Sequence, residues 1–565
     1  MAITTRSKNE ILVRRETIRA EAPPVPPAHD PAATAAANYD GRWLILLGLI
    51  TAAIMQVLDT TIVNVALPQM AGNFGATSQE IGWVVTGYIL SNVILLPMTA
   101  FLTQRFGRKR YLTASIIIFI VSSFFCGTSH SLGEMVFWRI MQGIGGAALL
   151  ATAQATIVQV FPPKEQGIVQ PIFMMALVVA PTVGPTLGGW ITDNYTWQWC
   201  FLINVPIGIL STFLVMTFLH DVEAPNKNIQ VDWLGIGLLA LGLGTLQYVL
   251  EEGQQNDWFN DPLILRLSIL SGASLVALIF WLLSPKNEKP IVDLRVLKNR
   301  TLDASLFLFI ALGFGLYGGS FLYPLLAQNI LGFTPMQTGL ALLPGGIATS
   351  CSILICGAII NRPKPLLDAR VLIIFGTVVT MLSLWMLGNL SVLSGEGDTT
   401  FALLIRGFAM GFIFVPLNQI AFASLEKKDI QQASGLLNLA RQLGGSFGIS
   451  ILATYLATHV QMHRMDMIGN FDAANPIYMQ RLYGAAGALT MHGYSPVDAL
   501  HAASAMMDGI IMRQATMMSY NDSFLMVLLF NVITAPAILL LGKASMKISG
   551  GEGGGQGGGH AAHMD

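Results

Sequence analysis

Long apolar runs separated by short polar segments recur along the chain between Trp43 and Leu541. Because a helix needs about 20 apolar residues to cross a hydrocarbon core of roughly 30 Å, each run of this kind predicts a membrane span. Fourteen such runs occur, near residues 43–66, 81–102, 111–128, 135–160, 168–191, 200–219, 232–251, 262–283, 303–325, 336–360, 369–390, 400–423, 434–457 and 520–541. The pattern therefore predicts an all-α membrane protein.

The composition agrees with a chain that crosses a bilayer many times. Of its 565 residues, 53% are hydrophobic and only 11% are charged, whereas soluble domains carry about 25% charged residues. The formal net charge of −1 gives no basic excess for nucleic acid, and the four cysteines lie in or beside apolar runs, so we expect no disulfide framework. Residues 1–42, rich in Pro and Ala, and 546–565, rich in Gly, are predicted to be disordered tails.

The positions of Lys and Arg predict the orientation, because cytoplasmic loops carry an excess of both. If both termini are cytoplasmic, all but seven of the 31 Lys and Arg residues fall in cytoplasmic segments. The exceptions are Arg464, Arg481 and Arg513 in an outer loop at 458–519, and Arg139, Arg266, Arg406 and Arg441 inside predicted spans. This segregation supports fourteen spans with both termini in the cytoplasm.

The outer loop 458–519 is unusually long and contains many Met and His residues. These side chains suit copper, but their spacing is irregular, so we predict no metal site. Within the loop, residues 496–515 place Leu500, Met507 and Ile511 on one stripe at helical spacing. This predicts an amphipathic helix, which either lies on the outer membrane surface, docks on a partner or packs on the rim of the chain's own spans.

Six short motifs follow one another along the chain. They are LDTTIVNVALP (58–68), AFLTQRFGRKR (100–110), RIMQGIGGA (139–147), APTVGPTLGG (180–189), FLINVPIG (201–208) and NLARQLGGSFG (438–448). Together these motifs resemble the signatures of the major facilitator superfamily, from about Trp43 to Leu541. They most resemble its fourteen-span drug:proton antiporters of the EmrB/QacA type, and within these the EmrB-like branch.

The resemblance implies the major facilitator fold, in which two six-helix bundles flank two extra spans. The bundles would be residues 43–220 and 301–545, and the extra pair with its cytoplasmic connector would be 221–300. The resemblance also implies a transporter, not an enzyme, without a cofactor, which uses protons to export amphipathic or lipophilic toxic compounds across the bacterial inner membrane. No GxxxxGK[ST] phosphate loop occurs, so ATP is not the expected energy source.

Two further implications concern partners and an alternative function. EmrB-like transporters resemble components of tripartite pumps, so the resemblance implies a periplasmic adaptor of the EmrA type and an outer-membrane channel of the TolC type. The alternative function is export or exchange of one specific metabolite. The glycine pattern of residues 180–189 is of the exporter type and argues against uptake.

The loop after the second span is a candidate for conformational gating. Its candidate residues are Arg105, Gly107, Arg108 and Lys109. Such a tight cationic turn can bind acidic groups or helix C-termini when the cytoplasmic side is closed, although it is alternatively only a topology signal. The family pattern usually has an acid at Gln104 and a Gly at Ala100, so a salt bridge through that acid is absent here.

The fifth span carries a second set of gating candidates. They are Gly184, Pro185, Gly188 and Gly189. Glycine allows close helix packing and proline breaks the backbone ladder locally. The resemblance implies that this stretch helps to close the route through the membrane, and packing without such a role is the alternative.

An acid inside the first span needs an explanation, because a charge at the centre of a membrane helix costs roughly 2.5–3.5 kcal/mol on insertion scales. Asp59 lies roughly 10 Å from the outer end of its span, and Arg139 lies at a similar depth in the fourth span. Burial disfavours an ionised carboxyl group and a nearby Arg favours it, so a movable partner makes a proton switch. We predict that Asp59 and Arg139 couple protons to transport, with a static ion pair as the alternative.

Other polar residues in the spans are candidates either for a substrate cavity or for polar packing. They are Gln56, Asn64, Gln142 and Arg441. Arg406 and Arg441 are also candidates for internal ion pairs, but the predicted spans of the second half contain no obvious acid to partner them.

Overall fold

A computed structural model describes the chain between residues 41 and 541. Within these limits the undescribed positions are 221–230, 286, 288–289, 361–366, 424, 426–428 and 470–474. The two predicted tails lie outside the described residues, except for the last two positions of the first tail. All regular elements in the described residues are helices, as expected where lipid leaves no other partner for backbone N–H and C=O groups.

Fourteen membrane spans are present in the described part of the chain, as predicted. Thirteen helices or helix runs are long and apolar enough to span a membrane, and α9, bent by 42° after Pro181, is the fourteenth. The first-half spans are α3 (Arg42–Phe74), α5–η1–α6 (Trp83–Phe106), α7 (Arg108–Thr128), α8 (Leu132–Val160), α9 (Pro163–Asn194) and α10–α11 (Trp199–Phe218). The others are α12 (Trp233–Glu252), α13 (Pro262–Leu283), α14 (Arg300–Asn329), α15 (Pro335–Ile360), α16 (Ala369–Leu387), α17 (Glu396–Ala423), α18 (Ile430–Ile468) and α20 with η4 (Pro496–Leu540).

Local sequence accounts for many helix boundaries and for the bend in α9. The Asp232, Asp261 and Asp368 side chains accept hydrogen bonds from first-turn N–H groups of α12, α13 and α16, which satisfies donors that a helix start leaves open. In α9, prolines occur at positions 171, 181 and 185. Proline lacks the N–H group and clashes with the preceding turn, so a bend after Pro181 has a direct cause.

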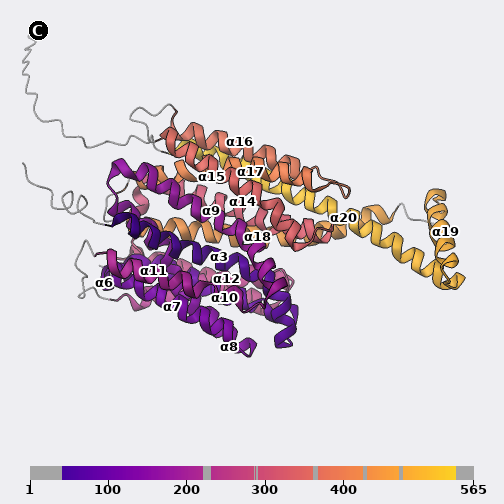
Figure 1. Cartoon of the computed structure of the whole chain (residues 1–565), viewed down its shortest axis with the longest axis horizontal. Helices are drawn as coiled ribbons and strands as arrows, with labels where there is room; N and C mark the ends of the chain where they lie inside the picture. Colours follow the sequence, from indigo (N-terminus) through magenta and orange to yellow (C-terminus); the bar gives the residue numbers. More distant parts are fainter. Residues whose placement is uncertain are drawn as a thin grey trace, which may run out of the picture.

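The helices form two halves with a seam between them (Figure 1). In the first half α3 packs on α9 and α11, and α8 packs on α5 and α7; in the second half α14 packs on α18, and α15 and α16 pack on α17. The halves meet where α9 packs on α15 and α8 on α18. The extra helices α12 and α13 pack together, and α12 contacts both α5 and α18. The extra pair therefore covers one edge of the seam.

Helices α18 and α20 are much longer than a span requires. Each has 39 residues, about 58 Å at 1.5 Å per residue, against a hydrocarbon core of roughly 30 Å. Their ends project beyond the bundle together with α19 (Pro476–Met491) (Figure 1). We call the described residues of 458–519 the outer extension. Two side-chain contacts brace it, the hydrogen bond between His463 Nε2 and Asp522 Oδ2 at 2.7 Å and the ion pair between Arg464 Nη2 and Asp508 Oδ1 at 2.8 Å.

The helix predicted at 496–515 exists, but it is not a separate surface helix. It forms the first part of α20 and continues into the last span. Of its predicted stripe, Ile511 is only 4% exposed and Met507 packs against the small core between α19 and α20, whereas Leu500 is exposed. Two of the three stripe residues therefore pack within the chain, and the apolar side chains left exposed on this helix include Leu500, Val497, Met506 and Ile510.

Candidate proton-coupling site

Glycines of α8 bring this helix close to both of its neighbours. A Cβ atom added at Gly145 would lie 2.7 Å from the backbone oxygen of Ser115 and 2.8 Å from the backbone nitrogen of Phe119 in α7. One added at Gly143 would overlap the backbone of Tyr88 in α5. The sequence RIMQGIGGA thus allows α8 to pack tightly between α5 and α7.

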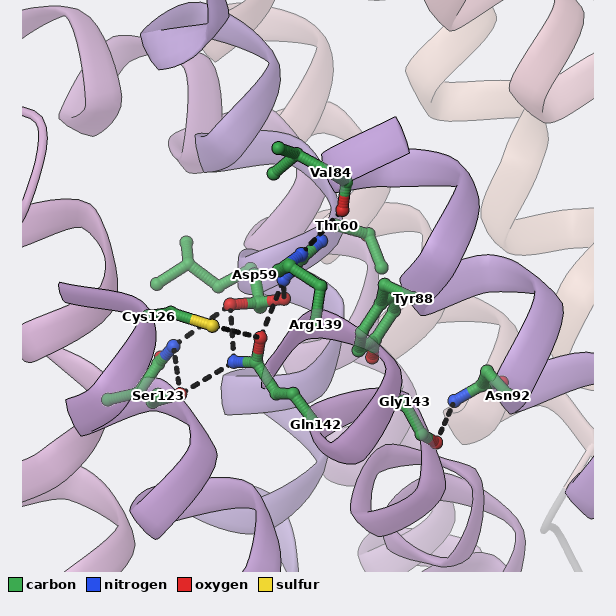
Figure 2. A network of polar contacts seen from close by, with 12 residues as sticks. Asp59, Thr60, Val84, Tyr88, Asn92, Ser123, Cys126, Arg139, Gln142 and Gly143 are labelled. Atoms are coloured by element: carbon green, nitrogen blue, oxygen red, sulfur yellow. Dashed lines mark hydrogen bonds and ion pairs between the residues drawn. The ribbon is translucent and has the colours of Figure 1, made fainter. Parts of the chain in front are cut away.

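The structure brings Asp59 of α3 and Arg139 of α8 into direct contact. Arg139 Nη1 lies 2.6 Å from Asp59 Oδ2, and the two side chains are 1% and 0% exposed. A contact of this length between ionised groups is a charge-assisted hydrogen bond. Figure 2 shows the pair enclosed by side chains and backbone of neighbouring helices. Asp59 and Arg139, which the sequence placed at a similar depth in their spans, therefore form a fully buried ion pair.

Other groups also contact the Arg139 guanidinium. Arg139 Nε donates to the backbone oxygen of Val84 at 2.7 Å, and Nη1 also donates to Gln142 Oε1 at 2.7 Å. The Tyr88 ring centroid lies 4.5 Å from Arg139 Cζ, within the range of a cation–π contact. The Arg139 side chain is thus held by α3, by α5 and by its own helix (Figure 2).

The second oxygen of Asp59 faces two neutral amides. Gln142 Nε2 donates to Oδ1 at 2.9 Å and Asn204 Nδ2 donates to it at 3.1 Å. Both amides also donate to Ser123 Oγ, at 2.6 Å and 3.3 Å. The network therefore joins four helices, α3, α7, α8 and α11, around one carboxylate.

This arrangement fits the ionised form of the acid. All three groups that hydrogen-bond to the Asp59 carboxylate among the described residues, from Arg139, Gln142 and Asn204, are donors. A protonated carboxyl group carries an O–H that needs an acceptor. None of these three contacts offers an acceptor for the O–H of a protonated Asp59.

The glycines of α9 contact α3 just beyond the acid. A Cβ atom added at Gly184 would overlap the Thr61 side chain, and one added at Gly188 would lie 2.9 Å from the backbone oxygen of Ile62. At Gly189, by contrast, an added Cβ would meet no atom within 4 Å. Gly184 and Gly188 thus hold α9 against the turn of α3 that follows Asp59, and Gly189 does not.

The same helix reaches the second half of the chain. A Cβ atom added at Gly339 of α15 would lie 3.0 Å from Thr186 Cβ, next to Pro185 in α9. A close-packed path therefore runs from α3, which carries Asp59, through α9 to α15.

The predicted cationic turn is a sharp break between two helices. Gly107 has φ = 84° and separates α6 (Thr99–Phe106) from α7. Only glycine adopts this backbone conformation easily. Arg105 precedes this break and stands 6.0 Å from the Phe106 ring centroid, and Arg108 and Lys109 open α7.

The predicted cavity residues do not lie together. Gln56 is buried and its Oε1 accepts from the backbone nitrogen of Leu150 at 3.0 Å, which joins α3 to α8. Asn64 is exposed and donates to the Thr60 carbonyl of its own helix. Gln142 belongs to the Asp59 network described above. The Arg441 side chain is half-buried in the second half of the chain.

Arg441 belongs to a polar cluster at the seam. Its Nη2 donates to Asn438 Oδ1 at 3.1 Å, and Asn438 Nδ2 donates to Gln154 Oε1 of α8 at 3.2 Å. Gln154 Nε2 in turn donates to Asn418 Oδ1 of α17 at 2.7 Å. These hydrogen bonds connect the two halves.

Sequence reasoning missed Asn204, Ser123, Gln154 and Asn418. The first of these lies inside the FLINVPIG motif, so an uncharged amide in an otherwise apolar stretch was an available signal. Neutral polar residues are common in all of the spans, however, and only the packing of helices selects these four.

The comparisons with known proteins agree with this architecture. The family model of the Major Facilitator Superfamily matches residues 49–449. Multidrug export protein EmrB of Escherichia coli (strain K12) is 34% identical over 456 residues, covering 80% of this chain and 88% of that protein. Fatty acid resistance protein FarB of Neisseria gonorrhoeae is 31% identical over 500 residues, covering 88% and 95%.

A solved structure shows the same fold at low sequence identity. The inward-facing bacterial homolog to the human lysosomal transporter Spinster superposes with a TM-score of 0.54 at 15% identity, covering 89% of this chain and 97% of that one. The chain therefore belongs to the major facilitator superfamily, as an EmrB-like multidrug efflux transporter that spans the bacterial inner membrane many times.

Proposed function

We propose that this chain is a proton-driven antiporter that exports amphipathic or lipophilic toxic compounds, with Asp59 and Arg139 as its proton-coupling pair. One observation carries the proposal. The fully buried Asp59 carboxylate is hydrogen-bonded to donors only, so gain or loss of a proton must change the contacts among four helices. An intramembrane carboxylate of this kind is functional by default, since it is costly and serves no spanning purpose.

The contacts suggest how a proton would act. Arg139 stays charged throughout, because a guanidinium does not release its proton in proteins. When Asp59 is protonated, the ion pair would lose its Coulombic attraction, and Arg139 Nη1 would be held by its hydrogen bond to Gln142 Oε1, which is 2.7 Å long. The turn of α3 beside Gly184 and Gly188 would then shift against α9, and α9 against α15.

Gating by the two glycine-containing segments is part of the same proposal. The cationic turn of Arg105, Gly107, Arg108 and Lys109 would hold the predicted cytoplasmic side shut in one state. Gly184, Pro185 and Gly188 would let α9 move between two packed positions, whereas Gly189, where an added Cβ would meet no atom within 4 Å, is left out of this proposal. The two halves, 43–220 and 301–545, would rock about the seam, with the polar cluster around Arg441 and Gln154 in the substrate route.

The test uses cells that lack their own efflux pumps and express the chain. We expect resistance to a panel of lipophilic weak acids and cations, and loss of that resistance in the Asp59→Asn variant at equal expression. The matched control is Asp193→Asn, which removes an exposed acid near the end of α9 and should retain resistance. Undiminished resistance in Asp59→Asn, or protection against one compound only, would contradict the proposal.

We further propose that both termini are cytoplasmic and that the outer extension meets a periplasmic adaptor of the EmrA type, which passes substrate to an outer-membrane channel of the TolC type. The extension is braced by the His463–Asp522 hydrogen bond and the Arg464–Asp508 ion pair, and it leaves large apolar side chains exposed, including Tyr483 on α19 and Met506 and Ile510 on α20. Exposed apolar groups of this kind are typical of protein interfaces.

Paired substitutions test this contact. Met506→Glu with Ile510→Glu should lower adaptor co-purification and whole-cell resistance while transport in adaptor-free proteoliposomes persists. The control is Leu393→Glu, an exposed apolar residue in the connection between α16 and α17, which should leave both unchanged. Full adaptor binding by the paired variant would place the contact elsewhere.

A further inference from the structure

A second intramembrane arginine lies in the core of the second half. Arg406 is in α17, ten residues after the helix begins at Glu396, or about 15 Å along the axis at 1.5 Å per residue. Its side chain is only 8% exposed. A guanidinium at this depth has lost most of its hydration, so its charge needs compensation from the protein or from a ligand.

The protein supplies hydrogen bonds to Arg406 but no negative charge. Arg406 Nη2 donates to the backbone oxygens of Gly315 and Leu316 in α14, at 2.6 Å and 3.4 Å. None of the ion pairs found among the described residues involves Arg406. The acids on the helices that line its surroundings lie toward the helix ends or in the outer extension: Asp303, Asp368, Glu396, Asp398, Asp498 and Asp508. Asp522 lies within α20, nine residues before Asn531, and its carboxylate contacts His463 Nε2 at 2.7 Å.

Glycines shape the place that the guanidinium occupies. A Cβ atom added at Gly319 would overlap the Arg406 guanidinium, so any larger residue there would displace it. A Cβ added at Gly315 would lie 3.8 Å from Asn531 Nδ2 of α20. The Arg406 and Asn531 side chains therefore approach the same point of α14 from two different helices.

Arg406 also lines a cavity between α14, α16, α17 and the end of α20, with a volume of about 40 Å³. Its polar lining consists of Arg406, Thr377, Thr380, Asn531 and Thr534, and the rest is apolar or glycine. A water molecule needs at least about 10–15 Å³ measured in this way, whereas a cavity of roughly 150 Å³ holds benzene. The space suits one small ion or a few waters, and it is too small for a drug.

The lining offers donors and no competing charge. A guanidinium has five N–H donors, and the hydrogen bonds found among the described residues use only its Nη2 group. Asn531 Nδ2 donates once, to the backbone oxygen of Val527 at 2.8 Å, which leaves its second hydrogen. These are the groups that bind an anion, and a monovalent anion would neutralise the buried charge.

We propose that the second half contains a binding site for a small monovalent anion of chloride size, formed by Arg406 and Asn531 in this cavity. The site is separate from the proton-coupling pair and does not depend on the function proposed above. The bound anion would neutralise Arg406 as the Asp59 carboxylate neutralises Arg139. Unlike the carboxylate, the anion would be exchangeable.

The experiment measures thermal unfolding of the purified full-length protein in detergent, with chloride or bromide exchanged for gluconate at constant ionic strength. We expect the unfolding temperature of the wild type to rise with halide concentration. Arg406→Gln should lose this rise. Thr377→Leu, which keeps the arginine and fills the cavity, should also lose it and decides the question if Arg406→Gln does not fold.

The control is Arg266→Gln, which removes an exposed arginine of α13 and should keep the halide response. A wild type without any halide response would overturn the proposal, because the cavity would then hold water only. A response that persists in both cavity variants, or disappears equally in Arg266→Gln, would place the effect elsewhere and would also overturn it.

Discussion

The two halves of the transporter each bury an arginine, but they treat its charge in opposite ways. Arg139 in α8 contacts a carboxylate at 2.6 Å, whereas Arg406 in α17 donates to backbone oxygens of α14. Where α3 carries Asp59, the contacted stretch of α14 is rich in glycine, from Gly313 to Gly319. Among the described residues, only the arginine of the first half has a titratable partner, and we infer that proton coupling belongs to the first half.

The largest difference between the two sites should appear in the stability that is lost when each arginine is replaced. Arg139→Ala leaves Asp59 buried without its partner, and breaking a buried pair in this way typically costs about 3–5 kcal/mol. Arg406→Met removes a charge that has no acidic partner in the described residues and fills similar volume, so we expect a smaller loss. Thermal unfolding of both variants in gluconate measures the stability that each one loses. Equal losses would mean that the two buried arginines do not differ in this way.

The glycines of α9 give a prediction with a built-in control. Gly188→Ala pushes a methyl group against the backbone of Ile62, and overpacking of this kind typically costs about 1–3 kcal/mol. Gly189→Ala meets open space and should be neutral. We expect the first variant alone to slow efflux in proteoliposomes. Similar rates for both would mean that the contact between α9 and α3 does not limit transport.

A smaller effect is expected from the amide that only the structure revealed. Asn204→Leu removes one donor from the Asp59 carboxylate, and hydrogen bonds favour the charged form that they stabilise. Loss of this hydrogen bond should slow gradient-driven efflux several-fold, since a single hydrogen bond contributes about 0.5–1.5 kcal/mol. Efflux as fast as in the wild type would separate Asn204 from coupling.

The smallest effect concerns the cationic turn of the first half. Arg108→Ala should slow turnover a few-fold, about 1 kcal/mol in the barrier, without weakening substrate binding, because the turn would act on the exchange between states. Transport rates and substrate binding to the purified variant check this. Equal transport rates for the variant and the wild type would mean that the turn only determines the membrane topology.

The fold was largely predictable from the sequence, because each span must be apolar over its full length. The number of spans followed from this constraint alone. The outer extension was less predictable: residues 458–519 lack the apolar length of a span, so the continuity of α18 and α20 beyond the bundle left no hydropathy signal. Packing also decided that Ile511 faces the chain's own helices.

The candidate site was predictable only where charge was involved. Asp59 and Arg139 stand out because charges are rare in spans, and their depths could be estimated from helix rise. Gln142 carried no such signal, and its position among four helices depends on how Gly143 and Gly145 pack. The cavity beside Arg406 depends on helix packing in the same way, so the sequence showed an unmatched arginine but not the space next to it.

The central claim is that Asp59 couples protons to export, and it is tested most directly in proteoliposomes containing Asp59→Asn. Two rates are measured in the same preparation: efflux driven by a pH gradient, and counterflow of labelled substrate without a gradient. The account predicts that the gradient no longer accelerates efflux while counterflow persists, since substrate exchange needs no change at residue 59. Efflux that a pH gradient still accelerates as in the wild type would contradict it.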